Sequence, residues 1–495
     1  MVVKKLIMKK NSVLQKNAVL NVLKQSCSIL FPLITLPYFS RVLGAEYFGK
    51  INFANSIINY FVLIAGLGIS SYAIREGARL RERKNKLTEF VNEIFTINLI
   101  SSIFSLVLLI IVVSLSSKLK EYRELLIIYS LIIILNVIGS DWINNIFEDF
   151  EYITIRFLLV HAIMLIPMFV FVRQKEDYML YALFTILAGY GGNLLNIIYI
   201  RKRVKRKLVR HANIRKHLPP ICVLFSSTIA ITIYMSSDIT MLGIMSTDKN
   251  VGIYSAASKI YIIIKELVNA ITMVMMPHIS NLLCSSDIDK KYDKLCSDVM
   301  KVLFALCMPI SVGLFSLSKE VILIINGAEY VSGVASLKIL SCALPWAVIS
   351  CFFVNAILIP NRKEKKSLFA TVIASFLNIS INIFLIPLLG ASGAAITTVI
   401  AEITVCFIAG YYARKEFEVT FERENFYSVI LGCLWIFLIC WINGRYIDLL
   451  LVRILLDIII SVLGYGFILL ILKNPIIKLI NNKKMEEMCE KSLFK

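Results

Sequence analysis

The sequence predicts an all-α integral membrane protein with about fourteen transmembrane helices. Three observations support this prediction. Of the 495 residues, 58% are hydrophobic and only 17% are charged, whereas soluble domains carry about 25% charged residues. The apolar residues gather into stretches long enough to cross a bilayer, and the basic residues gather in alternate loops between these stretches. This composition excludes an ordinary soluble enzyme, a disordered chain and a disulfide-rich secreted scaffold.

The predicted spans follow from the length of the apolar stretches. A helix needs about 20 apolar residues to cross roughly 30 Å of hydrocarbon. The candidates are 17–40, 51–73, 89–115, 124–146, 157–172, 179–200, 219–244, 251–277, 299–317, 334–360, 367–387, 391–413, 426–443 and 453–472. The fifth is short, and the region around Pro387 is where two spans could be read as one. We therefore expect about fourteen crossings.

The basic residues predict how the spans are oriented. The net charge of +20 could indicate nucleic-acid binding, but the charge is divided among several short loops. With fourteen spans, about 37 Lys and Arg residues lie in the two termini and the loops on their side, and about 10 lie in the opposite loops. The richest segments are 75–86, 201–216 and 362–366. The positive-inside rule then predicts a cell-membrane protein with both termini in the cytoplasm, and nucleic-acid binding loses its support.

Polar side chains recur at steps of three or four residues within several spans, which places them on one helical face. They are Asn17, Asn21, Lys24 and Ser28 in the first span; Asn52, Asn55 or Ser56, and Asn59 in the second; Ser227, Tyr234 and Asp238 in the seventh; Ser255, Ser258, Lys259, Glu266 and Asn269 in the eighth; and Thr371, Ser375, Asn378 and Asn382 in the eleventh. Asparagine and hydroxyl side chains often join neighbouring membrane helices. Such stripes therefore fit either interhelical hydrogen bonds or the wall of a cavity.

The ionisable members of these stripes favour a hydrated central cavity. A charged side chain exposed to lipid near mid-span costs about 2.5–3.5 kcal/mol even on the lower scales. Lys24, Asp238, Lys259 and Glu266 should therefore face protein or water. Seven other ionisable residues lie nearer the predicted span ends, where long side chains can reach the interface. They are Asp141, Glu148, Lys301, Lys338, Glu402, Arg453 and Asp457.

A short repeat predicts how the spans are organised. Gly49, Ala54 and Ile57 match Gly252, Ala257 and Ile260, and both sets begin corresponding spans six crossings apart. This spacing indicates two parallel six-helix lobes related by an axis along the membrane normal, with a site between them. The expected segments are a cytoplasmic tail (1–16), an N-lobe (17–200), a basic cytoplasmic linker (201–218), a C-lobe (219–413), two further spans (426–472) and a second cytoplasmic tail (473–495).

The motifs of common enzymes and metal sites are missing from the sequence. We find no P-loop, no G-x-S-x-G, no H-E-x-x-H and no glycine-rich nucleotide loop. The eleven cysteines show no C-x-x-C pair and no Cys/His cluster, so they are interpreted as small buried apolar residues. We therefore expect a protein that is not an enzyme and that has neither a metal nor a cofactor, apart from a proton or sodium ion used for coupling.

Several strings resemble the Wzx-type polysaccharide flippases of the multidrug/oligosaccharidyl-lipid/polysaccharide exporter superfamily. They are Pro32-Leu-Ile-Thr-Leu-Pro-Tyr-Phe-Ser-Arg41-Val-Leu-Gly44, Ala73-Ile-Arg75-Glu-Gly-Ala-Arg79, Asp141-Trp142 with Arg156 after it, Val251-Gly-Ile-Tyr-Ser-Ala-Ala-Ser-Lys259-Ile260, and Asn382-Ile-Phe-Leu-Ile-Pro387-Leu-Leu-Gly390-Ala-Ser-Gly393-Ala-Ala395. The resemblance covers residues 15–410. It implies transport of an oligosaccharide repeat unit on undecaprenyl pyrophosphate from the inner to the outer leaflet.

Two other functions stay open. One is a related transporter, either a flippase for lipid-linked peptidoglycan precursors or a multidrug exporter. The other is a membrane polysaccharide polymerase or glycosyltransferase, although such enzymes usually have long outer loops rich in Asp, Glu and Arg. For the flippase, the lipid bilayer and the lipid-linked oligosaccharide are the expected partners, and a polymerase and a co-polymerase are further candidates. The assembled product could be a capsule, an exopolysaccharide or an O-antigen.

The candidate substrate-binding residues follow from the charge of the expected head group. Lys24 and Lys259 are candidates for contacting the pyrophosphate, because a lysine inside a span can neutralise an anion there. Arg41 and Arg75 are placed nearer the two mouths of the cavity. Asn17, Asn21, Asn52 and Asn59 are candidates for hydrogen bonds to sugar hydroxyls, and Asp238 and Glu266 are candidates for carrying a coupling ion.

Overall fold

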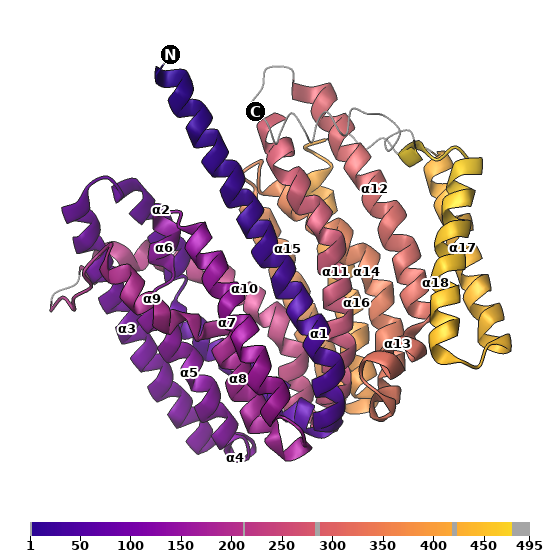
Figure 1. Cartoon of the computed structure of the whole chain (residues 1–495), viewed down its shortest axis with the longest axis horizontal. Coiled ribbons are helices and arrows are strands. Elements are labelled where there is room, and N and C mark those ends of the chain that lie inside the picture. Colours follow the sequence, from indigo (N-terminus) through magenta and orange to yellow (C-terminus); the bar gives the residue numbers. More distant parts are fainter. Residues whose placement is uncertain (1, 211–212, 283–287, 418–422, 478–495) are drawn as a thin grey trace. The chain divides into compact units, whose positions relative to one another are not determined.

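The computed structural model describes residues 2–210, 213–282, 288–417 and 423–477, and every regular element among them is helical (Figure 1). The predicted all-α fold is therefore confirmed. By their internal contacts the residues form two compact units, Met1–Gly252 and Ile253–Lys495. The predicted division into lobes 17–200 and 219–413 stays a prediction.

The described residues of the first unit form ten α-helices, a 3₁₀ turn and the start of an eleventh helix. They are α1 (Val2–Gly66), α2 (Ile69–Leu80), α3 (Lys84–Leu115), α4 (Ser117–Lys120), α5 (Arg123–Gly139), α6 (Trp142–Ile146), α7 (Phe150–Phe171), η1 (Lys175–Asp177), α8 (Tyr178–Tyr190), α9 (Gly192–Arg201), α10 (Ile214–Met245) and α11 (Asp248–Leu282). Helix α11 continues into the second unit.

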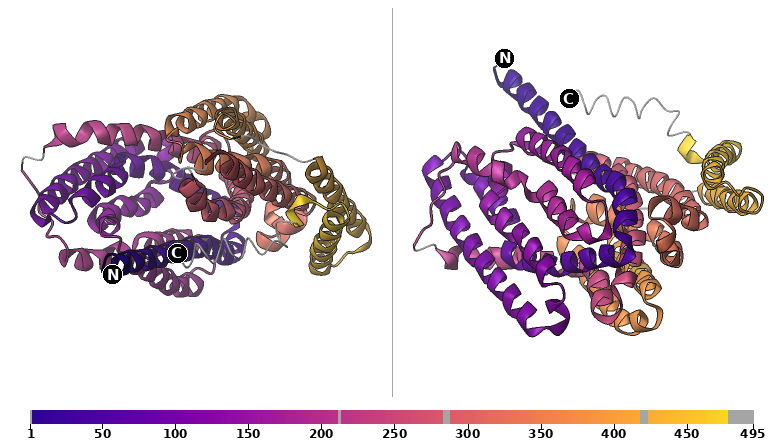
Figure 2. Two further views of the ribbon diagram at one scale, coloured as in Figure 1. Left: turned by 90° about the horizontal axis from the view of Figure 1, so that it is seen from above. Right: turned by 60° about the horizontal axis from the view of Figure 1, so that its bottom comes forward.

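The second unit contains the rest of α11 and nine further elements. They are α12 (Ile288–Ser316), α13 (Ser318–Ile325), the 3₁₀ turn η2 (Ala328–Gly333), α14 (Val334–Phe352), the π-helical turn η3 (Phe353–Leu358), α15 (Glu364–Leu389), α16 (Ala391–Ala413), α17 (Arg423–Tyr446) and α18 (Leu450–Ile471). Helices α17 and α18 pack on each other as a hairpin, which Figures 1 and 2 draw in yellow.

Eleven helical segments among the described residues are long and apolar enough to cross a membrane. The first segment, Leu23–Leu80, contains most of the first predicted span (17–40) and all of the second (51–73). Helix α5 is not among the eleven, and it has only 17 residues. Helix α11 is also not among them, and its middle carries Lys259, Lys265 and Glu266. The chain is thus a multi-pass membrane protein, and the count of fourteen spans stays a prediction.

Two glycines mark where helices of the predicted spans break. Gly44 has a φ of 69° and interrupts α1 between the first and second predicted spans. Gly390 has a φ of 54° and separates α15 from α16, where the sequence around Pro387 left one span or two possible. Side chains other than glycine rarely adopt such positive φ values. Glycine at these two positions therefore permits the chain to turn between consecutive helices.

Large hydrophobic side chains are exposed along many of these helices. Among them are Ile110 on α3, Phe376 and Leu388 on α15, and Val462 on α18. A soluble monomer rarely exposes large contiguous apolar patches. Exposed apolar side chains on long helices are expected where the surrounding solvent is lipid.

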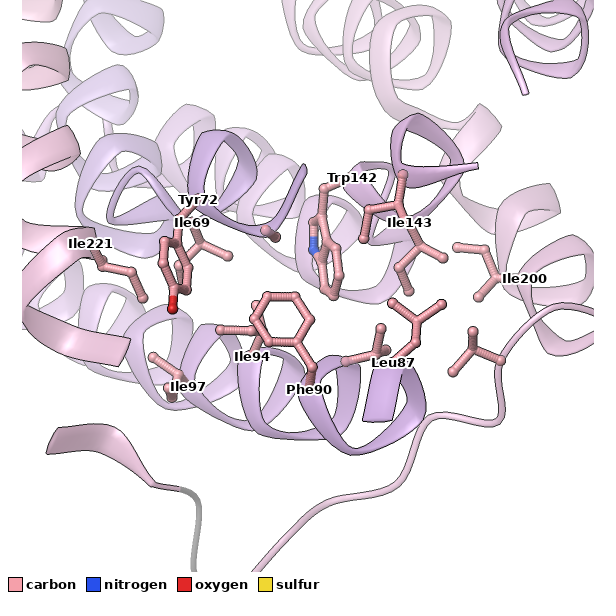
Figure 3. Packing of buried hydrophobic residues seen from close by; sticks show 14 residues of the cluster. Ile69, Tyr72, Leu87, Phe90, Ile94, Ile97, Trp142, Ile143, Ile200 and Ile221 are labelled. Atoms are coloured by element: carbon pink, nitrogen blue, oxygen red, sulfur yellow. The ribbon is translucent and has the colours of Figure 1, made fainter. Parts of the chain in front are cut away.

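A hydrophobic cluster holds the shorter helices of the first unit together (Figure 3). Phe90 and Ile94 of α3 pack beneath Trp142 of α6, and Ile69 and Tyr72 of α2 close one side. A buried polar chain continues from this cluster. The Tyr72 hydroxyl lies 2.9 Å from His217 Nδ1, and Glu93 Oε2 lies 2.8 Å from His217 Nε2. The amino-terminal part of α10 is thereby tied to α2 and α3.

The two glycines of the repeat lie against each other. A Cβ added to Gly49 would come within 1.8 Å of the Asp248 carbonyl oxygen, and one added to Gly252 would come within 1.8 Å of the Ala45 carbonyl oxygen. The Tyr122 hydroxyl also donates a hydrogen bond to the Asp248 carboxylate. Small residues let membrane helices approach to backbone contact. This close crossing explains why α1 and α11 both carry glycine here.

We predict that Gly49→Ala and Gly252→Ala each destabilise the protein, by about 1–3 kcal/mol, because the added methyl group meets backbone rather than a movable side chain. Thermal unfolding of the purified protein in detergent measures the effect. Gly189→Ala is the matched control, because that glycine is exposed in α8 with no atom within 4 Å of its added Cβ. Unfolding midpoints equal to wild type in both crossing variants would contradict the close packing.

Candidate functional site

Lys24 lies on α1 beside helix α7. Its side chain is half-buried, and its ammonium nitrogen is 5.7 Å from the centre of the Phe157 ring. It is also within electrostatic range of Asp141 and Arg156. The contact of α1 with α7 is reinforced where the Thr154 hydroxyl donates to the Leu20 carbonyl at 3.3 Å. The Lys24 side chain therefore lies against other parts of the protein.

Arg156 and Asp141 form the strongest ion pair near Lys24. Arg156 Nη2 donates to both carboxylate oxygens of Asp141 at 2.7 Å, and the guanidinium group is only 7% exposed. Asn144 and Asn196 each donate to Asp141 Oδ1 at 3.2 Å. The carboxylate is neutralised by Arg156, so Lys24, Asp141 and Arg156 together carry one positive charge.

The break between α5 and α6 positions Asp141. Ser140 ends α5 with a φ of 44°, and Arg206 of the basic segment 201–210 donates to the Ile138 carbonyl at 2.6 Å and to the Ser140 hydroxyl at 2.9 Å. A cation at the carboxyl terminus of a helix can donate hydrogen bonds to the last carbonyl groups, which have no partner within the helix. Burial lowers the pKa of Arg206, which nonetheless stays charged because arginine is always protonated in proteins. The basic segment therefore also has a structural role, because Arg206 caps the end of α5.

A second polar group of the first unit lies between α1 and α10. The Thr240 hydroxyl donates to Ser56 Oγ at 3.0 Å and to the Tyr60 hydroxyl at 3.3 Å. Asp238, two residues before Thr240, is buried and is within electrostatic range of Tyr60. Asp238 therefore lies in a polar setting inside the protein, as its position in the seventh span requires.

The asparagine candidates differ in their surroundings. The Asn52 amide is buried and donates to the Phe48 carbonyl of its own helix at 2.6 Å. This bond uses the amide within the helix, although the other donor and acceptor sites of the amide remain. Asn59 is half-buried on the same helix. The side chains of Asn17 and Asn21 lie outside the described residues.

The two arginine candidates are exposed. Arg41 lies just before the break at Gly44. Arg75 lies on α2, and its Nε donates to Glu76 Oε1 at 3.1 Å. Exposure at a helix break and on a short connecting helix fits positions near the ends of the spans. Their roles in binding stay predictions.

Lys259 and Glu266 both lie on the part of α11 that belongs to the second unit, and both are half-buried. Two turns of helix separate them. Lys265, next to Glu266, pairs with Glu402 of α16 at 3.4 Å, and the Tyr261 hydroxyl donates to the same carboxylate at 3.2 Å. A buried ionic group therefore joins α11 to α16 beside the predicted coupling residue.

The pair of Lys265 with Glu402 is the part of the site that the sequence analysis missed. Glu402 was expected to reach the membrane interface, but it is 5% exposed and lies in the middle of α16. Its central position in an apolar helix was the available signal. The expectation is wrong because Glu402 is buried and pairs with Lys265 of α11 inside the protein.

Other ionisable residues expected at the interface are also buried. Lys301 is 4% exposed and lies 3.7 Å from Asp298 one turn away. Asp457 of α18 is fully buried, and Arg453 lies 2.8 Å from Glu320 of α13. Glu148 is exposed and pairs with Arg81 at 3.1 Å. Interface exposure is therefore wrong for Lys301 and Asp457, because each finds a partner inside the protein.

A π-helical turn lies close to the ionic group of Lys265, Glu402 and Tyr261. The turn η3 follows α14, and Asn355 within it donates to Cys351 Sγ at 3.1 Å. Cys351 is in turn within electrostatic range of Glu266, Lys265 and Glu402. Single π-helical turns are frequent at functional sites, because they displace side chains from regular helical positions. Among the described residues, no three His, Cys, Asp or Glu side chains cluster as a metal site would require.

Long apolar helices with ionisable groups held between them are the architecture of a multi-pass membrane transporter. The chain belongs to the polysaccharide biosynthesis protein family, whose sequence pattern matches residues 14–283, more than half of its length. The predicted resemblance to polysaccharide flippases is confirmed at the level of the family.

Two relatives extend this similarity. The "Putative O-antigen transporter" of Escherichia coli (strain K12) is 25% identical over 415 residues, which cover 81% of this chain and 97% of that protein. A protein of the same name from Shigella dysenteriae is 24% identical over 407 residues, which cover 79% of this chain and 98% of that protein. Both relatives are named as transporters, which agrees with the prediction that this chain is not an enzyme.

Solved structures share the fold. The lipid II flippase MurJ in an inward closed conformation has a TM-score of 0.73 at 18% identity, with 92% of this chain and 100% of that chain covered. An inward-facing multidrug resistance MATE family transporter of the MOP superfamily has a TM-score of 0.52 at 15% identity, with 81% and 94% covered. At these identities the likeness concerns the fold alone.

We predict that Lys265→Met destabilises the protein by about 3–5 kcal/mol, because Glu402 is then buried without its cation. The double variant Lys265→Met/Glu402→Gln should recover most of this loss. A double-mutant cycle on unfolding free energies in detergent measures the coupling. The control cycle uses the exposed pair of Arg81 and Glu148, 3.1 Å apart, for which about 0–1 kcal/mol is expected. Equal coupling energies in the two cycles would contradict a buried pair.

Proposed function

We propose that this protein is a flippase that moves undecaprenyl-pyrophosphate-linked oligosaccharide repeat units from the inner to the outer leaflet of the cell membrane. Its relatives named as O-antigen transporters align over almost their whole length, and they support a lipid-linked polysaccharide as the substrate. The proposal includes cytoplasmic termini, alternating access through a cationic central cavity, and delivery to a polymerase and co-polymerase.

The observation that carries this proposal is the placement of Lys24. Its ammonium group is held half-buried inside a membrane helix, beside an Asp141–Arg156 pair that is already balanced. A pyrophosphate crossing hydrocarbon without a counter-charge would be very costly. At about 4 Å and an effective dielectric constant of 20, one pair of unit charges contributes about 4 kcal/mol before desolvation. Lys24 can supply one such charge, and we assign the same role to Lys259.

The remaining candidates complete the path of the substrate. Arg41 and Arg75 are exposed, and we assign them to the capture and release of the pyrophosphate near the cavity mouths. Asn17, Asn21, Asn52 and Asn59 are assigned to the sugar hydroxyls. A multidrug exporter for cationic drugs would be poorly served by a lysine such as Lys24, because like charges repel. A flippase for lipid-linked peptidoglycan precursors has the same pyrophosphate chemistry, and its substrate differs in the sugars and in the peptide attached to them.

We predict that Lys24→Met/Lys259→Met reduces polysaccharide export by at least about tenfold, since losing about 1.4 kcal/mol of binding already gives that factor. The protein should still reach the membrane at wild-type level, as immunoblotting of membranes would show. Export is measured as surface polysaccharide in cells that lack the native transporter. Lys249→Met, an exposed residue in the first turn of α11, is the control and should export normally. Full export by the double variant would overturn the assignment.

Energy for the step has two sources in this proposal. An inside-negative potential favours exit of an anion by about 2.3 kcal/mol per charge per 100 mV. Asp238 and Glu266 are assigned to an inward proton or sodium ion. Asp238 is buried beside hydroxyl groups, and Glu266 lies next to the ion pair of Lys265 and Glu402.

We predict that flipping in reconstituted vesicles accelerates under an inward proton or sodium gradient. Asp238→Asn/Glu266→Gln should remove this acceleration while leaving the rate without a gradient intact. Rates are compared with each gradient imposed and then collapsed by an ionophore. Wild-type rates that ignore both gradients would exclude coupling through these carboxyl groups.

A further inference from the structure

A buried ionic cluster lies where the α17–α18 hairpin meets α13, apart from the residues assigned to transport. Arg453 Nη1 of α18 lies 2.8 Å from Glu320 Oε1 of α13. Arg453 Nε lies 3.7 Å from Asp457 Oδ2, one turn along α18. Asn443 of α17 donates to Asp457 Oδ1 at 2.7 Å. The cluster therefore combines two carboxyl groups with one guanidinium group.

The two carboxyl groups of the cluster are buried. Glu320 is 3% exposed and Asp457 is fully buried, whereas the Arg453 side chain is 19% exposed. The neighbouring charged side chains Lys319, Arg445 and Asp448 are all exposed, so they point away from it. Helix α17 contributes Asn443 and the thiol of Cys440, and α18 contributes Ser461 beside Asp457. If both carboxyl groups were ionised, the cluster would carry one uncompensated negative charge.

Some buried polar atoms of the cluster lack a hydrogen-bond partner. Glu320 Oε2, Asp457 Oδ2 and Arg453 Nε are buried without a hydrogen-bond partner. The gap of 3.7 Å between Arg453 Nε and Asp457 Oδ2 is too long for a hydrogen bond. A buried carboxylate oxygen without a donor is costly. This free-energy cost is much smaller when the carboxyl group binds a proton.

An apolar cavity borders the carboxyl group of Asp457. The cavity has a volume of about 430 Å³ and is lined by side chains of α11, α12, α13, α17 and α18. Pro309, Ile310 and Leu314 of α12 line one wall, and Asp457 and Ser461 of α18 line the other. Apart from Asp457, the lining residues include no acid or base other than Cys440 and Tyr465. An apolar neighbour disfavours the ionised carboxylate and favours the neutral acid.

We propose that Glu320, Arg453 and Asp457 form a proton-binding site in which one carboxyl group is protonated at neutral pH. The proton comes from solvent and forms one O–H bond with a carboxylate oxygen, so the cluster becomes neutral as a whole. A hard cation such as sodium would need several oxygen ligands, and the guanidinium of Arg453 would repel it. A proton needs only one oxygen.

Release of the proton has a mechanical consequence. The cluster joins α18 to α13, and α18 also packs on α12, where the Tyr465 hydroxyl donates to the Ala305 carbonyl at 2.7 Å. An unbalanced charge beside the apolar cavity would weaken this packing or draw water into the cavity. Proton occupancy thus controls how firmly the appended hairpin is held to the rest of its unit. This site is independent of the proposed transport of polysaccharide.

Infrared difference spectroscopy of the lipid-reconstituted full chain tests the proposal. The carbonyl stretch of a protonated carboxylic acid should be present at neutral pH in the wild type and vanish at alkaline pH. Asp457→Asn and Glu320→Gln should each abolish it, because either change leaves one carboxylate balanced by Arg453. Asp448→Asn, which changes an exposed aspartate in the connection between α17 and α18, should leave it unchanged. A wild type without the band, or a band that survives both substitutions, would overturn the proposal.

A second measurement needs no variant. Because the folded state binds a proton that the unfolded state releases, stability should fall as pH rises from about 4, where carboxyl groups of the unfolded chain ionise, to the pH at which the folded cluster loses its proton. The thermal midpoint of the wild type should fall over that interval, and Asp457→Asn should flatten the dependence if it folds. A wild-type midpoint that does not fall, or one that rises with sodium concentration at constant pH and ionic strength, would contradict a proton site. The sodium result would indicate a metal-ion site instead.

Discussion

The cost of an unpaired charge in hydrocarbon governs where this chain places its ionisable side chains. Arg156 neutralises Asp141 in the first unit, and Lys265 neutralises Glu402 in the second. Each pair joins two helices that are far apart in sequence or separated by a break, so charge pairing also fixes which helices are neighbours. Removing one partner leaves a buried charge, which is far more damaging than never having had the pair. The pairs therefore act as specific contacts between otherwise apolar surfaces.

The same constraint distinguishes structural charges from functional ones. Most of the Lys and Arg residues lie in the loops between the predicted spans, where the positive-inside rule predicts that they orient the chain across the membrane. The paired charges within the spans hold helices together. Lys24 differs from these paired charges, because it lies beside a pair that is already balanced. In the proposed function the cargo supplies its counter-charge during part of the cycle. The carboxyl group in excess at the α13–α18 cluster has a different counterpart, because we propose that a proton neutralises it.

The all-α membrane fold could be predicted from the sequence, because a long apolar segment can cross a membrane only as a helix. The glycine repeat was recognised as a repeat. That Gly49 and Gly252 touch each other could not be predicted, because the pattern carries no information on which helices cross. Glu402 and Asp457 were misplaced for the same reason. Glu402 pairs with Lys265 of α11, and Asp457 lies one turn from Arg453 on α18. Only the packing of the helices shows that these partners are inside the protein.

The central claim is that cationic residues within the spans recognise the pyrophosphate of a lipid-linked oligosaccharide. Flipping by the purified chain in proteoliposomes tests it most directly, with two fluorescent polyprenyl oligosaccharides that differ only in having a pyrophosphate or an uncharged linker. The account predicts rapid flipping of the pyrophosphate lipid and, for the uncharged one, a rate no higher than in protein-free liposomes. Equal protein-dependent rates for the two lipids would contradict it.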